Sequence, residues 1–302
     1  MNSDNNQIKM LATSIHQLTR IDNYVDTKVP GLTVFKKTEA NIPQVGMYEP
    51  SVCLIAQGAK KVLLGHEQFI YDTQHYIFSC VHLPVVSQVI DASNDTPYLG
   101  LKLNFDYQEL ALLIADLDLP LPKNQKASPG MATGDLTDEL INAFQRLINL
   151  EEESEHIHIL APIIRREIFY RLLTGEQGEK LMRLSAMGTH TQQVAQSISW
   201  IKTHFAQSIN IEMLAEMANM ASSTFHQHFR KMTAMSPLQY IKQLRLQEAR
   251  KLMLTQHFDA SRACFHVGYD SPSQFSREYK RLFGDSPAKH ITKLRNNLSS
   301  KS

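Results

Sequence analysis

The chain contains little cysteine, and the cysteines that it has are far apart. Cys53, Cys80 and Cys264 are the only three in 302 residues, and no two of them form a C-x-x-C pair. This pattern excludes a scaffold held by several disulfides and gives no sign of a thiolate zinc site. We expect all three thiols to be reduced.

Long apolar runs are also missing. No uninterrupted apolar stretch approaches the roughly 20 residues that a membrane-spanning helix needs. The first twenty residues, MNSDNNQIKMLATSIHQLTR, lack the charged start, apolar centre and small-residue cleavage site of a secretory signal. The expected location is therefore the cytoplasm.

The motifs of common catalytic sites do not occur either. There is no G-x-S-x-G, H-E-x-x-H or phosphate-loop glycine pattern, so hydrolase and nucleotide-binding functions have no positive support. The sequence predicts no catalytic residue, no metal ligand and no cofactor. With 302 residues, of which 43% are hydrophobic and 20% charged, the chain can bury a core and is expected to divide into two domains.

The net charge of +1 hides an uneven distribution. Residues 191–302 hold 15 Lys and Arg against 7 Asp and Glu, a net charge of +8, whereas residues 1–190 hold 16 against 23, a net charge of −7. A basic segment of this kind indicates an acidic polymer as partner, although a solvated basic face gives the same count.

The hydrophobic pattern changes along the chain and predicts an α+β protein. From about Pro30 to Leu103, short apolar or alternating runs such as GLTVFKK, SVCLIAQG, KKVLLG, EQFIYD, QHYIFSCV and YLGLKLNF predict six or more strands in a small sandwich or barrel. From Asp106 the spacing becomes helical, and a linker is expected at MGTHTQ, residues 187–192. We therefore expect a β-barrel domain at 1–105, a helical region at 106–190 and an all-α domain at 191–302.

The basic segment contains one pattern twice. ASSTFHQHFRKMTAMSP at 221–237 and SPSQFSREYKRLFGDSP at 271–287 align at an offset of fifty residues without a gap from Phe225 onward. Upstream of the turn the best register shifts by one residue, which predicts a turn one residue longer in the second copy. Asn210 and Asp259 are predicted to cap the first helix of each copy, and Ser222 and Ser271 to begin the second.

Each copy fits the helix-turn-helix plan of two short helices joined by a tight turn. Phe225 and Phe229 in one copy, and Phe275 and Tyr279 in the other, are one helical turn apart and are predicted to anchor the second helix to its core. The outward residues are types that contact base edges or phosphates in the major groove. The candidate DNA-binding residues are Ser223, Thr224, His226, Gln227, Arg230 and Lys231 in the first copy and Ser273, Gln274, Arg277, Lys280 and Arg281 in the second. Among these, Lys231, Lys280 and Arg281 are better placed for phosphates than for bases.

A long helix is predicted between the copies, from Ser236 to about Gln256. At 1.5 Å per residue it would hold the two units roughly 30 Å apart. That separation is close to the ~34 Å between successive major-groove segments on one face of DNA. The spacing suits one chain that reads two turns of double-stranded DNA.

At this point the residues resemble a known family. Residues 194–295 are similar to the DNA-binding domain of the AraC/XylS family of transcription regulators, and VGYDSPSQFSREYKRLFGDSP is a close match to that family's signature in its second helix-turn-helix. The resemblance implies that the second helix of each unit is the recognition helix. His226 and Gln227 depart from the Gln or Arg often found there, which leaves the base preference of the first unit open.

The amino-terminal part also resembles this family. YEPSVCLIAQGAKKVLLGHEQFIYD, DTPYLGLKLNFD and LAPIIRREIFYRLLTGEQGEKLMRL are similar to the AraC-type amino-terminal domain. The resemblance implies a cupin-like β-barrel that senses a small-molecule effector or another signal, followed by helices that form a homodimer contact. It further implies RNA polymerase as a partner and activation as the commoner outcome.

Two other functions follow from different features. A metal-dependent cupin enzyme would use histidines of the β region, His66, His75 and His82 with Glu67, but their spacing is not the H-x-H of a metal cupin, and surface or turn positions fit them better. A helical adaptor that binds protein rather than DNA would also explain the polar helix faces. Cys53 and Cys80 could sense redox state if their thiols were accessible, whereas as buried residues they would act as small apolar side chains.

Overall fold

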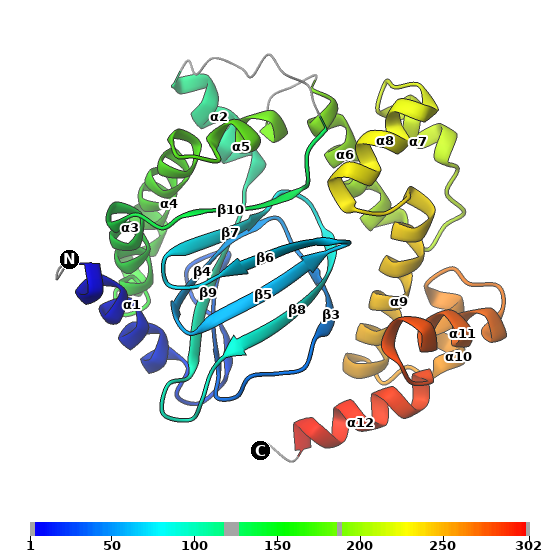
Figure 1. Cartoon of the computed structure of the whole chain (residues 1–302), viewed down its shortest axis with the longest axis horizontal. Helices are drawn as coiled ribbons and strands as arrows, with labels where there is room; N and C mark the ends of the chain where they lie inside the picture. Colours follow the sequence, from blue (N-terminus) through cyan, green and yellow to red (C-terminus); the bar gives the residue numbers. More distant parts are fainter. Residues whose placement is uncertain (1–3, 118–126, 186–188, 300–302) are drawn as a thin grey trace.

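The computed structural model describes residues 4–117, 127–185 and 189–299. Its amino-terminal half is built from ten strands with helices on one side, and its carboxyl-terminal part is helical (Figure 1). The strands are β1 (Tyr24–Asp26), β2 (Leu32–Lys37), β3 (Gln44–Tyr48), β4 (Ser51–Gln57), β5 (Ala59–Leu64), β6 (Glu67–Tyr71), β7 (His75–Ser79), β8 (Leu83–Asp91), β9 (Tyr98–Asn104) and β10 (Met131–Asp135). The α+β class and the six named strands are confirmed.

The described helices divide between the two halves. The first set is α1 (Asp4–Leu18), α2 (Tyr107–Asp116), α3 (Asp138–Asn149), a short 3₁₀ turn at Ser154–His156, α4 (Ile157–Thr174) and α5 (Gly178–Ser185). The second set is α6 (His190–His204), α7 (Ile211–Met217), α8 (Ser222–Thr233), α9 (Pro237–Thr255), α10 (Ala260–His266), α11 (Pro272–Phe283) and α12 (Pro287–Ser299).

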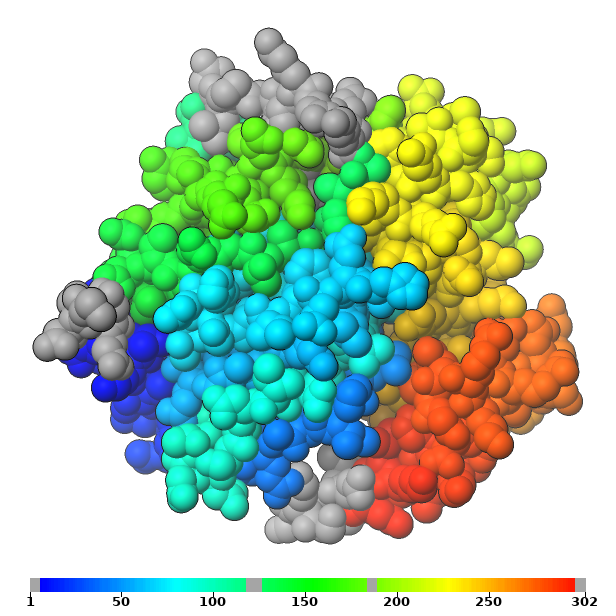
Figure 2. Space-filling view, viewed as in Figure 1, coloured from blue at the N-terminus to red at the C-terminus, as the bar shows by residue number. Residues whose placement is uncertain are grey.

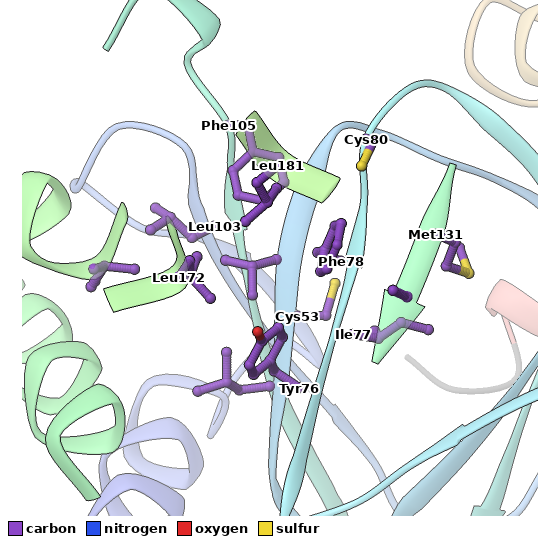
Figure 3. Close-up of a cluster of buried hydrophobic side chains, with 14 of the residues drawn as sticks. Cys53, Tyr76, Ile77, Phe78, Cys80, Leu103, Phe105, Met131, Leu172 and Leu181 are labelled. Carbon is purple, nitrogen blue, oxygen red and sulfur yellow. The ribbon is translucent and has the colours of Figure 1, made fainter. Parts of the chain in front are cut away.

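The strands form two antiparallel sheets with the orders β1-β2-β9-β4-β7-β10 and β3-β8-β5-β6. Nearly every residue of β4, SVCLIAQ, is buried, because β4 is a central strand and α1 also packs on it. Figure 3 shows how side chains of this sheet and of the helices meet in one core, with Phe78, Leu103 and Phe105 near Leu172 and Leu181. The β5–β6 pair belongs to the other sheet and ends in a turn at Gly65 and His66.

Three features differ from the sequence-based expectation. Helix α1 and strand β1 precede the predicted β region, and β10 lies inside the predicted helical region. The β10 segment, MATGD, carries little strand signal of its own and forms a strand because it pairs with β7 along five residues. The linker that was predicted at residues 187–192 is wrong for residues 189–192, which form the start of α6. Thr189 caps this helix, because its side chain accepts a hydrogen bond from Gln192 N. Residues 187 and 188 lie outside the described part of the chain.

The buried apolar residues fall into two clusters. The first extends from Leu11 in α1 to Leu244 in α9 and includes α7 and α8. The second is smaller and joins the carboxyl-terminal half of α9 to α10, α11 and α12. The first helix-turn-helix unit therefore shares its buried cluster with the β domain, whereas the second does not. The predicted division of the chain at residues 105 and 190 is a separate matter and stays a prediction.

Candidate nucleic-acid interface

The first repeated unit consists of α7 and α8. Asn210 caps α7, since its side-chain oxygen accepts the Glu212 backbone N–H at 2.7 Å, as predicted. Ser222 is the first residue of α8, as expected, and Ala221 holds the capping position without a side-chain hydrogen bond. The rings of Phe225 and Phe229 are completely buried, which confirms their role as anchors.

The second unit consists of α10 and α11. The Asp259 carboxylate caps α10 by accepting the Arg262 backbone N–H at 2.7 Å, and Ser271 caps α11 through Gln274 N at 3.3 Å. Pro272 occupies the first turn of α11, and Gly284 ends it with a positive φ of 85°. Phe275 and Tyr279 are buried as predicted.

The turn lengths explain the register shift between the copies. Residues 218–221 separate α7 from α8, whereas residues 267–271 separate α10 from α11. The second turn is one residue longer, as predicted. The two recognition helices themselves align without a gap.

The candidate DNA-binding residues lie on the outward surfaces of α8 and α11. Ten of the eleven are exposed and Thr224 is partly exposed. The exposed residues are Ser223, His226, Gln227, Arg230, Lys231, Ser273, Gln274, Arg277, Lys280 and Arg281. Lys231, Lys280 and Arg281 lie in the last helical turns. This arrangement offers hydrogen-bonding and cationic groups on two helices whose other faces are fixed by buried rings.

Helix α9 connects the units over 19 residues, a length of about 28 Å. A capping box of Ser236 and Gln239 begins it. Arg245, in its middle, donates to three backbone carbonyls, those of Phe205, Gln207 and Gly268. Because these carbonyls belong to the end of α6 and the turn after α10, Arg245 fixes the orientation of α9 relative to both. The sequence signal for this residue was a basic side chain in the middle of an amphipathic helix.

Glu278 is a second residue that sequence reasoning missed. Its carboxylate accepts hydrogen bonds from Lys242 at 2.7 Å, the Tyr269 hydroxyl at 2.7 Å and the Gln274 amide at 3.2 Å. Burial alone would raise the pKa of Glu278, but these hydrogen bonds hold it below the usual value. The ionised carboxylate positions Gln274 and ties α11 to α9.

The first unit lies directly against the β domain (Figure 2). Gly130 N donates to the Met232 carbonyl of α8 at 2.9 Å, and next to this unit the Tyr240 hydroxyl of α9 donates to the His82 carbonyl at 2.9 Å. Lys231 Nζ is 3.4 Å from Glu67 Oε1 across a cleft of about 1030 Å³. His226, Gln227 and Arg230 line one side of this cleft, and His66 and Glu67 line the other.

In the part of the chain that the structure describes, no ion pair joins the outward residues of the second unit to the β domain, and their acidic neighbour is Glu278 of α11 itself, which accepts a hydrogen bond from Gln274. Within the described residues, Arg277, Lys280 and Arg281 form no ion pair. Part of the predicted interface is therefore open to solvent, while the α8 part faces the β5–β6 turn.

The histidines of the β region are spread over several strands and turns. His66 lies in the exposed β5–β6 turn, His75 begins β7 and contacts Asp72, and His82 follows β7. In the described segments of the chain, no three His, Cys, Asp or Glu side chains come together as metal ligands.

All three cysteines are buried. Burial raises the pKa of Cys53 and of Cys80 above the ordinary value, so both remain thiols rather than reactive thiolates. Figure 3 places both side chains in the apolar core. Cys264 is completely buried as well, in the cluster that joins α9 to α10 and α11. Among the helices of the described residues, none is long and apolar enough to cross a membrane.

Comparison with known proteins gives two family matches. The model for the AraC-type transcriptional regulator N-terminus matches residues 28–180, and a helix-turn-helix domain model matches residues 214–292. The HTH-type transcriptional activator RhaS of Escherichia coli O157:H7 is 24% identical over 152 residues, which are 49% of this chain and 53% of RhaS. The chain thus spans about half the length of the curated relatives that it matches.

Solved structures share the fold. Apo ToxT from Vibrio cholerae, in a variant form, superposes with a TM-score of 0.59 at 11% identity, over 87% of this chain and 97% of ToxT. Wild-type ToxT with an unsaturated fatty acid bound gives a TM-score of 0.57 over 86% of this chain and 94% of ToxT, also at 11% identity. With a family match over half of its length and a second over both helix-turn-helix units, the chain belongs to the AraC/XylS family of transcription regulators.

Proposed function

We propose that this protein binds double-stranded DNA in a sequence-specific manner and regulates transcription. The observation that carries the proposal is the pair of helix-turn-helix units, each with buried aromatic anchors and an exposed polar and basic recognition helix. Ser273, Gln274 and Arg277 in α11, and Ser223, Thr224, His226 and Gln227 in α8, contact base edges. Arg230, Lys231, Lys280 and Arg281 contact phosphates or the rim of the groove.

The amino-terminal domain is proposed as the sensor of a small-molecule effector. Its two sheets enclose polar groups, and the structurally similar ToxT has been solved with an unsaturated fatty acid bound. The contacts between the β5–β6 turn and α8 give the sensor a direct route to the first recognition helix. The result of sensing is proposed to be activation through RNA polymerase, because the matched relative RhaS is an activator. Because such a role requires access to DNA, we propose the cytoplasm as the location of the protein.

The helical region is proposed to form the homodimer contact. Ile159, Ile163 and Tyr170 lie on α4 at helical spacing and are 57%, 61% and 43% exposed. An apolar stripe on one helix face is a surface that a second copy can cover. Light scattering should give the mass of a dimer for the purified chain and of a monomer for Ile163→Glu; a monomeric parent protein would disprove the contact.

The salt dependence of DNA binding tests the proposed function. Purified protein should retain specific fragments from its source genome, and these fragments should bind more tightly than random DNA of equal length. Because the proposed interface uses basic side chains on phosphates, log affinity should fall linearly and steeply with log salt concentration. Fluorescence anisotropy at several salt concentrations measures the affinity for specific and for random DNA and the dependence of each affinity on salt. An affinity that does not change with salt, or that is the same for all fragments, would contradict the assignment.

A further inference from the structure

Gln274 lies in the first turn of the second recognition helix, the part of such a helix that contacts base edges. Its backbone N–H donates to Ser271 Oγ at 3.3 Å, which fixes the start of α11. The side chain is exposed, and its amide Nε2 donates to Glu278 Oε1 at 3.2 Å, one helical turn further along. A neighbouring residue therefore sets the orientation of the Gln274 amide before DNA is bound.

Glu278 is itself held by two further groups. Its Oε1 also accepts a hydrogen bond from Lys242 Nζ of α9 at 2.7 Å, and its Oε2 accepts one from the Tyr269 hydroxyl at 2.7 Å, in the turn before α11. Only 13% of the Glu278 side chain and 5% of Tyr269 are exposed. Because donors hold both oxygens, rotation of this carboxylate would break at least one charge-assisted hydrogen bond.

The charge of Glu278 decides which way the Gln274 amide points. Burial acts to raise the pKa of Glu278, but the hydrogen bonds from Lys242, Tyr269 and Gln274 hold it below the usual value, so the group is ionised at neutral pH. An ionised carboxylate accepts hydrogen bonds and has none to donate. The amide must turn Nε2 toward Glu278, since Oε1 in the same place would face a second acceptor.

The rest of the Gln274 amide is left for DNA. Of its two N–H groups one is used by Glu278, and within the described residues its Oε1 accepts no hydrogen bond. One donor next to one acceptor matches adenine, whose N7 accepts and whose N6 amine donates in the major groove, whereas guanine presents two acceptors there. The orientation set by Glu278 also removes part of the entropy cost of ordering this side chain on DNA.

We propose that Glu278 is a positioning residue that makes Gln274 select an adenine in the operator. The inference rests on the proposed function, because it names the base that one of the proposed DNA contacts selects. It goes beyond the tie between α11 and α9, since a tie alone predicts no effect on base preference.

The first experiment locates the base pair that Gln274 contacts. Each base pair of a retained operator fragment is replaced in turn, and anisotropy gives the affinity of the parent chain and of Gln274→Ala for every fragment. At one position the parent chain should prefer A·T over the other pairs by about tenfold, and Gln274→Ala should lose this preference alone. For the parent chain, 7-deazaadenine at that position should weaken binding severalfold, because it lacks the N7 acceptor.

The second experiment tests the role of Glu278. Glu278→Gln keeps the size of the side chain, but an amide can donate or accept and no longer dictates how Gln274 points. The A·T preference at the located position should fall by about threefold or more. Tyr269→Phe is the matched control, because it removes a donor to the same carboxylate and leaves the Gln274 bond in place, so the preference should stay unchanged.

The readout is the ratio of two affinities of one variant, so a general loss of stability does not change it. Glu278→Ala is an independent second variant and should lose the preference as well. A preference for another base pair at the located position, no position that depends on Gln274, an unchanged ratio in Glu278→Gln, or equal losses in Glu278→Gln and Tyr269→Phe would each overturn the inference while the proposed function stands. Absence of specific binding to any fragment would contradict the proposed function, and this inference with it.

Discussion

The two helix-turn-helix units are built on one plan and placed in different surroundings. Both bury a pair of aromatic anchors, at Phe225 and Phe229 in one and at Phe275 and Tyr279 in the other. The first unit shares its buried cluster with the β domain, and its outward face meets the β5–β6 turn. The second belongs to a separate cluster with α9, α10 and α12, and its outward basic residues form no ion pair within the described chain. We infer that the amino-terminal domain controls the first helix-turn-helix unit, whereas the second unit is free to bind DNA.

The largest expected effect comes from the anchors. Phe225→Ala and Phe275→Ala should each cost about 3–5 kcal/mol of local stability, because each leaves a cavity in a packed core. If the clusters are separate, Phe275→Ala should speed hydrogen exchange in α10 and α11 while leaving β4 protected, whereas Phe225→Ala should also speed exchange in the β domain. Hydrogen-exchange mass spectrometry measures the exchange rates of these segments in each variant. Equal changes in β4 for the two variants would show that the clusters act as one.

The next effect concerns base contacts by the second unit. Arg277→Ala should reduce the discrimination between operator and random DNA by about 1–3 kcal/mol if the guanidinium contacts a base. Lys280→Ala is the matched control on the same helix and should weaken binding to both DNAs alike. Anisotropy titrations on the two fragments separate the cases. Equal weakening on both fragments in Arg277→Ala would limit that residue to phosphate contact.

The smallest effect concerns the contact that holds the first unit. Glu67→Gln removes the partner of Lys231, and an exposed ion pair of this kind contributes about 0–1 kcal/mol. Operator affinity should therefore rise by up to about fivefold relative to Asp95→Asn, which removes one exposed acidic charge from the same domain. Anisotropy at low salt provides the measurement. Identical affinities of the two variants would show that the Glu67 contact does not restrain α8.

The parts of this structure that sequence could predict are those set by local chemistry. The caps at Asn210, Asp259 and Ser271, the buried aromatic pairs and the length of α9 all follow from residue type and spacing. The strand β10 could not be predicted in this way, because MATGD forms a strand only through its pairing with β7. The same holds for the contacts of Lys60 with Tyr48, Tyr71 and Tyr98, because these four side chains come from four strands and meet only when the two sheets are formed.

The local sequence pattern also predicted the candidate DNA-binding residues, but it did not predict which parts of the protein surround them. Nothing in the spacing of His226, Gln227 and Arg230 shows that they face His66 and Glu67 across a cleft. Glu278 was missed because an acidic residue does not fit a search for basic groups, although it holds Gln274 in place. Long-range contacts therefore decide how the two similar units differ.

Hydroxyl-radical footprinting on a retained operator fragment tests the central claim most directly. Two readers joined by α9 should protect two segments about one helical turn, or roughly 10 base pairs, apart on one face of the DNA. Arg277→Ala should weaken one protected segment, and Gln227→Ala should weaken the other. A single protected segment, or loss of the same segment in both variants, would contradict the account of two readers in one chain.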